Sequence, residues 1–225
     1  VPDTVVVGGI KYKVTEIPKD AFKGSKTVKS IQIGKYVMTI DNEAFAGCEE
    51  LTSITIPDSV QSIGSKAFYN CRKLKTVNLS KNSNLKVISS NAFNNCTELT
   101  KIVIPDAVTK IDTKAFYGCK KLKTVTISTK SKLTQIGNGA FQKCAALQKI
   151  TLPSKMQKLG SNAFNGCKKL KTITVKSTKM KSVGKNAFKG IQSKATIKVP
   201  KKKLSSYKRL FKGKGQKKTV KIKKG

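Results

Sequence analysis

The chain has 225 residues, of which 47 are Lys or Arg and 11 are Asp or Glu, so its formal net charge is +36. It contains no His, which removes the commonest general base, and it has no Gly-rich phosphate-binding loop. No apolar run is long enough to cross a membrane as a helix. We therefore predict no enzyme, no catalytic residues, no cofactor and no transmembrane segment.

The charges are distributed unevenly along the chain. Residues 1–112 hold 15 basic residues and all 11 acidic residues, a net charge of +4, whereas residues 113–225 hold 32 basic residues and no acidic one. Such a field attracts acidic polysaccharides or wall polymers, although a Lys-rich surface also serves solubility alone. Only two of the basic residues are Arg, the residue that makes most bidentate contacts to bases, so we expect no specific nucleic-acid binding.

The N-terminal segment, residues 1–20, is predicted to contain a β-hairpin. Three consecutive Val residues precede Gly8-Gly9, and residues 10–14 then alternate apolar and basic side chains. A Gly-Gly pair between two extended segments is typical of a tight hairpin turn. The chain opens at Val1-Pro2 without a Met, which we interpret as the removal of a leader.

Residues 21–200 contain eight copies of one motif. An Ala-Phe pair recurs at steps of 23 to 25 residues, at Ala21, Ala44, Ala67, Ala92, Ala115, Ala140, Ala163 and Ala187. Six copies have a Cys four residues after the Ala and a Leu seven residues after it, and Ile, Val or Leu stands at ten and twelve residues. No single copy can bury so many apolar side chains alone, so the period indicates a solenoid of stacked coils.

Each coil is predicted to have two extended segments and one turn. The Leu-x-x-Ile-x-Ile segment alternates at its end and is rich in β-branched residues, which favours a short strand. A Val-x-x-Ile segment before each Ala-Phe pair gives a second, shorter extended piece. The Ala-Phe-x-x-Cys segment is too short for a helix and predicts a helical turn. Alternate coils match best, as in CRKLKTV, CKKLKTV and CKKLKTI from residues 71, 119 and 167, which indicates duplication of two coils together.

The combined pattern AFxxCxxLxxIxIPxxVxxIG closely resembles the BspA-type leucine-rich repeats of bacterial surface and secreted proteins. This resemblance covers nearly the whole chain. It implies a leucine-rich-repeat solenoid, a right-handed curved superhelix that is mainly β with short helical turns and has a sheet on its concave face. It also implies an extracellular or cell-surface location and an adhesive or ligand-binding role. The motif itself contains core residues only, so it identifies no binding residue.

Residues 201–225 are predicted to form a basic C-terminal cap with a capping helix. Leu204, Tyr207, Leu210 and Phe211 have helical spacing, and the glycines that follow would end the helix. A disordered polycationic tail is the alternative, against which the regular apolar spacing argues. Open solenoid ends expose core and strand edges, so we interpret the hairpin of residues 1–20 as the N-terminal cap.

The six Cys residues occupy one column of the repeat. They are Cys48, Cys71, Cys96, Cys119, Cys144 and Cys167, and Ser25 and Ile191 continue the column at its two ends. This favours buried, reduced thiols that act as small apolar side chains, with disulfides between adjacent coils as the alternative. The spacing of 23 or 25 residues, the lack of His and the lack of any Cys-x-x-Cys pair argue against a metal site.

The outward side of the long strands is the candidate binding surface. It is formed by the positions eight, nine and eleven residues after each Ala, and its candidate residues are Lys75, Thr76, Asn78, Lys101, Lys123, Thr124, Thr126, Lys149, Thr151, Lys171, Thr172 and Thr174. Solenoids bind partners on such concave faces. Thr for strand propensity and Lys for solubility would give the same pattern without a ligand. No aromatic hot spot marks a tight protein site, which leaves weak, repeated contact with an extended polymer.

These observations predict a monomeric, non-catalytic surface or secreted protein. It would bind a host or bacterial surface protein, or a glycan, through its concave sheet. The alternative is a module that binds polyanions, or anchors the protein to the cell wall, through the Lys-rich C-terminal half.

Overall fold

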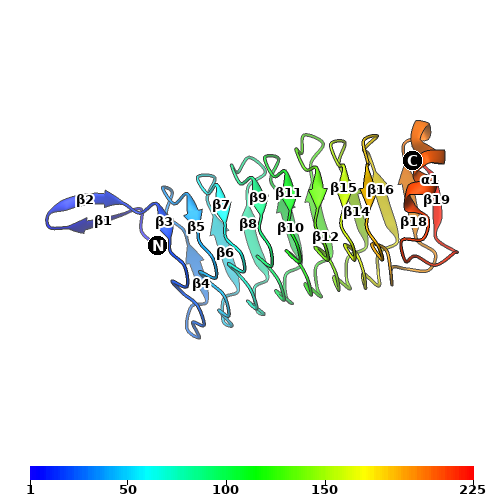
Figure 1. Cartoon of the computed structure of the whole chain (residues 1–225). Coiled ribbons are helices and arrows are strands. Elements are labelled where there is room, and N and C mark those ends of the chain that lie inside the picture. The colour runs from blue at the N-terminus through cyan, green and yellow to red at the C-terminus, as the bar shows by residue number, and fades with distance from the viewer.

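A computed structural model describes residues 1–225, and it is a solenoid whose coils stack along one axis (Figure 1). Each coil has a long strand, a short strand and a run of turns, and the two termini lie at opposite ends of the stack. The long strands are β4 (Ser30–Gln32), β6 (Ser53–Ile56), β8 (Thr76–Leu79), β10 (Lys101–Ile104), β12 (Thr124–Ile127), β14 (Lys149–Leu152), β16 (Thr172–Val175) and β18 (Thr196–Val199). The predicted leucine-rich-repeat solenoid is confirmed.

The short strands form one continuous parallel sheet of eight strands. They are β3 (Glu16–Ile17), β5 (Thr39–Ile40), β7 (Ser62–Ile63), β9 (Val87–Ile88), β11 (Lys110–Ile111), β13 (Gln135–Ile136), β15 (Lys158–Leu159) and β17 (Ser182–Val183). Each short strand covers the last two residues of a Val-x-x-Ile segment, which was expected to be extended. The second residue of the strand is buried in every coil, as Ile111 is, so this sheet forms one wall of the core.

The long strands are also parallel, but their backbone ladder is interrupted twice, between β8 and β10 and between β12 and β14. At both interruptions the step from one long strand to the next is 25 residues instead of 23. The extra residues lengthen the loop after the strand, where Ser83 and Ser131 are buried. Their hydroxyl oxygens accept the N–H of Leu85 at 3.3 Å and of Leu133 at 3.2 Å, so each widened loop satisfies its own backbone.

The Ala-Phe side of the coils is a ribbon of consecutive tight turns, where we had expected a helical turn. In coil after coil the residue before the Ala and the third residue after it have positive φ, as with 58° at Asn91 and 60° at Asn95. Gly and Asn, which tolerate this conformation best, fill most of these positions. The turns also join neighbouring coils, because the Phe93 N–H donates to the carbonyl of Ala115 at 2.8 Å.

The core is built around a stack of Phe rings. Phe22, Phe45, Phe68, Phe93, Phe116, Phe141, Phe164 and Phe188 are stacked with neighbouring ring centroids 5.0 to 6.3 Å apart and ring planes within 6°. Beside them runs the Cys column, in which all six thiols are free and buried. Each thiol donates to the Phe carbonyl of the preceding coil, as Cys96 Sγ does to Phe68 O at 3.2 Å.

The C-terminal segment continues this core. It consists of a 3-10 turn η1 (Lys201–Lys203), helix α1 (Leu204–Phe211) and a last parallel strand β19 (Lys221–Lys224) beside β18. Phe211 extends the Phe stack, with 5.6 Å between its ring centroid and that of Phe188. The buried Tyr207 hydroxyl accepts the N–H of Met180 at 2.9 Å and lies 3.2 Å from the carbonyl of Ser177. Helix α1 therefore covers the C-terminal end of the core.

The N-terminal hairpin forms but does not cover the core in the way we had expected. Strands β1 (Thr4–Val7) and β2 (Ile10–Lys13) pair only with each other and project from the stack (Figure 1). Their apolar side chains are 41% to 67% exposed, Val6 being the most exposed. Within residues 1–20, β3 belongs to the first coil because it pairs with β5. Contacts to the first coils hold only the base of the segment, where Asp3 Oδ1 accepts the N–H of Lys35 at 2.9 Å and the N-terminal ammonium group donates to the carbonyl of Gln32 at 2.9 Å.

Candidate binding surface

The long-strand face is the outward side of the strands β4 to β18 and of the residues just before them. On each strand, side chains alternate between core and solvent: in β14, Ile150 and Leu152 are buried and Lys149 and Thr151 are exposed. The ladder keeps equivalent positions in register, since Lys149 pairs with Thr172 in β16. The result is a flat, stacked surface of Thr, Lys and Asn.

All twelve predicted residues lie on this face and are exposed or half-buried. Lys75, Lys123 and Lys171 stand just before β8, β12 and β16, and the other nine lie within β8, β10, β12, β14 and β16. Among them, only Asn78 uses its side chain in a hydrogen bond, donating to Thr55 Oγ1 at 3.1 Å. The predicted positions are thus brought together on one side, and apart from Asn78 their polar groups make no side-chain hydrogen bond within the protein.

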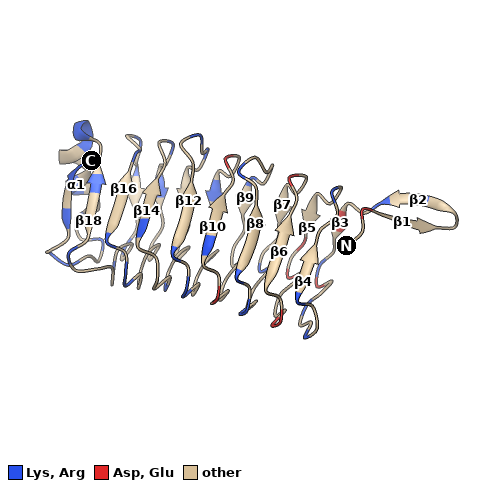
Figure 2. Ribbon diagram, turned by 180° about the vertical axis from the view of Figure 1, so that it is seen from behind, with Lys and Arg blue, Asp and Glu red and all other residues tan.

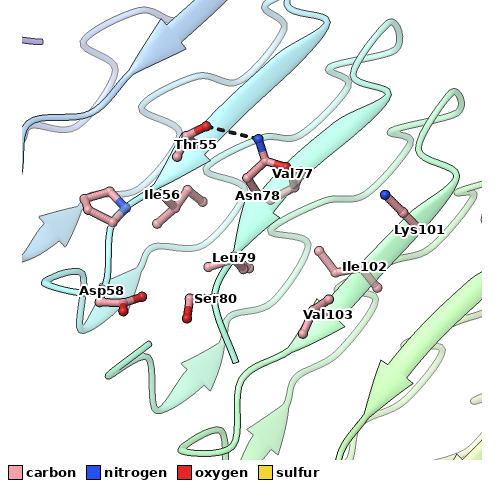
Figure 3. Close-up of a pocket in the computed structure, with 11 residues that line it drawn as sticks. Thr55, Ile56, Asp58, Val77, Asn78, Leu79, Ser80, Lys101, Ile102 and Val103 are labelled. Atoms are coloured by element: carbon pink, nitrogen blue, oxygen red, sulfur yellow. Dashed lines mark hydrogen bonds between the residues drawn. The ribbon is translucent and has the colours of Figure 1, made fainter. Parts of the chain in front are cut away.

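A hollow of about 570 Å³ lies on this face over β6, β8 and β10 and spans the gap between β8 and β10, where the backbone ladder stops (Figure 3). Its apolar lining comes from Ile56, Val77, Leu79, Ile102 and Val103, and its polar lining from Thr55, Asp58, Asn78, Ser80 and Lys101. Figure 3 shows the Lys101 ammonium group and the Asp58 carboxylate at different edges of the hollow. The hollow therefore combines an apolar floor with groups of both charges.

Sequence reasoning identified only part of this hollow. It named Asn78 and Lys101 and placed Thr55 at an outward position of the repeat, but it missed Asp58 and Ser80. The available signal was the longer step of 25 residues between Ala67 and Ala92, which marks the place where the two long strands lose their ladder.

Ion pairs are confined to the N-terminal half of the solenoid. Every side-chain ion pair lies within residues 3–121, including Lys73–Glu50 at 2.6 Å and Lys121–Glu98 at 2.8 Å between neighbouring coils. Figure 2 shows the same division: the acidic residues stop part-way along the stack, and Lys continues to the C-terminus. The Lys side chains beyond residue 121 therefore have no carboxylate partner.

One group of these unpaired Lys residues surrounds a second hollow beside α1. It has a volume of about 500 Å³ and is lined by Lys208, Lys212, Lys217 and Lys218, together with Gln216.

No three His, Cys, Asp or Glu side chains converge in a way that would hold a metal ion. Burial raises the pKa of the Cys96 and Cys144 thiols well above the usual range, so these thiols are held protonated.

The repeat is matched by a known family. The BspA type leucine rich repeat region, in six copies, matches residues 15–133 and 121–225. The chain belongs to this family. No curated protein matches the chain. No helix in the structure has the length and apolar character needed to cross a membrane.

Several solved bacterial structures share the fold. A leucine-rich repeat protein from Bacteroides ovatus ATCC 8483 is 23% identical with a TM-score of 0.60, over 100% of this chain and 70% of that one. A leucine rich cell surface protein from Faecalibacterium prausnitzii A2-165 is 25% identical with a TM-score of 0.67, over 99% of this chain and 64% of that one. A leucine-rich repeat protein from Eubacterium ventriosum ATCC 27560 is 26% identical with a TM-score of 0.57, and this chain spans 50% of its length.

Proposed function

We propose that this chain is a monomeric, non-catalytic binding module of a cell-surface or secreted bacterial protein, and that it holds a protein or glycan partner on its long-strand face. The observation that carries the proposal is the hollow between β8 and β10. The description of the similar Faecalibacterium protein as a cell surface protein supports the location.

The make-up of the hollow supports binding. Ligand sites combine an apolar lining with a few polar groups that fix orientation. Here the half-buried Val103 gives apolar surface, and Asn78 and Lys101 present donors at the rim. Since Lys101 makes no ion pair, it can meet a partner's acceptor without first breaking a protein contact.

The rest of the face supports repeated contact. Equivalent Thr and Lys positions recur in successive long strands, in register from β14 to β16. A partner with its own repeat would meet one group per coil, and many weak contacts add up to tight binding when they are linked. We therefore expect the hollow to give specificity and the neighbouring coils to add affinity.

A pair of variants tests this placement. Asn78→Ala combined with Lys101→Ala removes both polar rim groups of the hollow, whereas Thr151→Ala combined with Lys149→Ala removes the equivalent positions of β14. Both should be assayed by surface plasmon resonance against any partner found among acidic glycans, wall polymers and host matrix proteins. The hollow variant should weaken binding at least tenfold, and the β14 variant should do so less. If neither variant weakens binding, the long-strand face is the wrong location.

A second candidate function is the binding of acidic polymers, or attachment to the cell wall, through the Lys-rich C-terminal half. The observation that favours it is the absence of any ion pair beyond residue 121, together with the basic hollow beside α1. Four Lys side chains around one hollow repel one another, and an anion between them would relieve that repulsion.

Charge reversal tests this second function better than truncation. Removing residues 201–225 would also remove Tyr207 and Phe211 from the core. Lys208, Lys212, Lys217 and Lys218 should instead be changed to Glu together and compared with the same change at Lys176, Lys179, Lys181 and Lys185. Both variants have the same net charge. Equal loss of binding to a soluble polyphosphate would indicate the overall field alone, and greater loss in the first variant would locate the site beside α1.

A further inference from the structure

A third hollow lies on the turn side of the coils, away from the long-strand face. It has a volume of about 570 Å³ and extends from Lys23 in the first coil to Lys114 before the fifth Ala-Phe pair. We call it the turn-face hollow. Tyr69 forms its aromatic wall, and Asn70, Asn91 and Asn94 supply amide groups.

The hollow exists because the second coil lacks bulky side chains at two positions. Ala46 lines it at the position two residues after the repeat Ala, where the next coil has Tyr69. The following position is Gly24 in the first coil and Gly47 in the second, with φ of 70° and 71°. Backbone atoms therefore form the floor of the hollow. The Tyr69 side chain lies beside Ala46, which fills the equivalent position of the preceding coil with a methyl group only.

The charges at the hollow are partly compensated, because its lining holds Lys23, Lys66 and Lys114 but only one carboxylate, Glu43. Glu43 lies between two ammonium groups, with Lys23 Nζ at 2.7 Å from Glu43 Oε2 and Lys66 Nζ at 3.2 Å from Glu43 Oε1. Both Lys residues are thus already paired, unlike the Lys residues beyond residue 121. Lys114 is the one ammonium group of the lining without a carboxylate partner, so the site offers donors and acceptors in a weaker positive field than that of the C-terminal half.

The amides leave one acceptor without a donor. Asn94 Nδ2 donates to Asn91 Oδ1 at 2.7 Å, but the side-chain oxygen of Asn94 has no hydrogen-bond partner and is buried, since the residue is only 6% exposed. Buried polar atoms are rarely left unpaired. Rotation of the Asn94 amide toward the hollow would let a ligand hydroxyl donate to this oxygen.

We propose that the turn-face hollow binds a short neutral glycan, with one sugar ring against Tyr69 and sugar hydroxyl groups at the Asn amides. Tyr presents an apolar ring face together with a polar tip, and amides both donate and accept hydrogen bonds, so the two suit the C–H faces and hydroxyls of a sugar. The paired charges at Glu43 favour a neutral ligand over an acidic one.

The test is a titration of the full chain with cellotetraose, chitotetraose and mannotetraose, followed by saturation-transfer NMR at about 300 mM salt to suppress charge effects. Tyr69→Ala should lower the affinity for the bound tetraose at least tenfold. Tyr117→Ala is the matched control, because Tyr117 occupies the same column two coils further on and does not line the hollow. It should bind like the wild-type chain.

A second variant keeps the test valid if loss of Tyr69 unfolds a coil. Ala46→Gln fills the hollow with a residue that the same column already holds at Gln142, so the fold should tolerate it. This variant should lose tetraose binding while its melting temperature stays near that of the wild type. The proposal is overturned if no tetraose binds at about 1 mM, or if filling the hollow leaves the affinity unchanged. The Asn78 and Lys101 variants of the long-strand face should not affect this binding, which separates the two sites.

Discussion

Lys121 donates to Glu98 at 2.8 Å across two neighbouring coils, from equivalent positions of the repeat. Lys73 and Glu50 form the same contact one coil pair earlier, at 2.6 Å. Acidic and basic coils alternate in the sequence, and in these two coil pairs the acidic coil forms an ion pair with the basic coil that follows it. In the next coil pair the acidic position is Ala146, and Lys169 opposite it has no partner.

Restoring the missing acid should stabilise the solenoid. Ala146→Glu places a carboxylate where Glu50 and Glu98 stand in the earlier pairs, within reach of Lys169. An exposed pair of this kind contributes about 0.2–1 kcal/mol. Urea unfolding at low salt should show that gain, with Ala146→Gln as the uncharged control. Equal free energies of unfolding for the Glu and Gln variants would show that the register does not bring these positions together.

Removing one ring from the Phe stack should be far more costly. Phe93 is fully buried between two rings whose centroids are 5.1 and 5.4 Å away. Phe93→Ala should lower the free energy of unfolding by about 3–5 kcal/mol and divide the array into parts that unfold separately. Phe22→Ala, at the half-buried end of the stack, should cost less. A loss below about 1 kcal/mol at Phe93 would contradict its place in the core.

Acid should weaken the first coils through Glu43. Hydrogen bonds from Lys23 and Lys66 hold the pKa of the Glu43 carboxyl below its ordinary value. The stabilisation is therefore fully present above the ordinary pKa of Glu and is lost as the pH falls through the lowered value. Between about pH 6 and about pH 3, Glu43→Gln should lose less stability than the wild-type chain does. Glu49 makes no ion pair, so Glu49→Gln should keep the wild-type acid dependence, and the same dependence in both variants would contradict this assignment.

The thiols should be unreactive until the chain unfolds. All six are buried, and each donates to a Phe carbonyl of the preceding coil. A thiolate-selective aromatic disulfide reagent should label none of them in the native protein at mildly alkaline pH and all of them in concentrated guanidinium chloride. Rapid labelling of the native chain, or fewer than six reactive thiols after unfolding without reductant, would contradict the buried, reduced column.

The repeat made the core predictable residue by residue. Columns such as the Phe at 93 and the Cys at 96 had to be buried, because every coil reserves the same positions for apolar side chains. The long-strand face followed from the two-residue period of strands such as β14. These features depend on spacing alone, and spacing is what a sequence records directly.

Features outside the shared columns were not predictable in the same way. The direction in which the hairpin projects is not set by packing of its apolar side chains, since Val6 stays exposed. No position of the repeat constrains that direction either. The hollow between β8 and β10 depends on how two extra residues near Ser83 displace a ladder, which the pattern of apolar residues does not specify. The turn-face hollow likewise results from a small residue, Ala46, next to a large one in the neighbouring coil.

The central claim is that a partner binds the long-strand face at the hollow between β8 and β10. The most direct measurement is a binding screen of the intact chain against acidic glycans, wall polymers and host matrix proteins at about 50 and about 300 mM salt, repeated with the Asn78→Ala/Lys101→Ala variant. We predict at least one partner whose binding survives the higher salt and is weakened at least tenfold in the variant. Binding that disappears at the higher salt for every anion alike, or that the variant leaves unchanged, would contradict the claim.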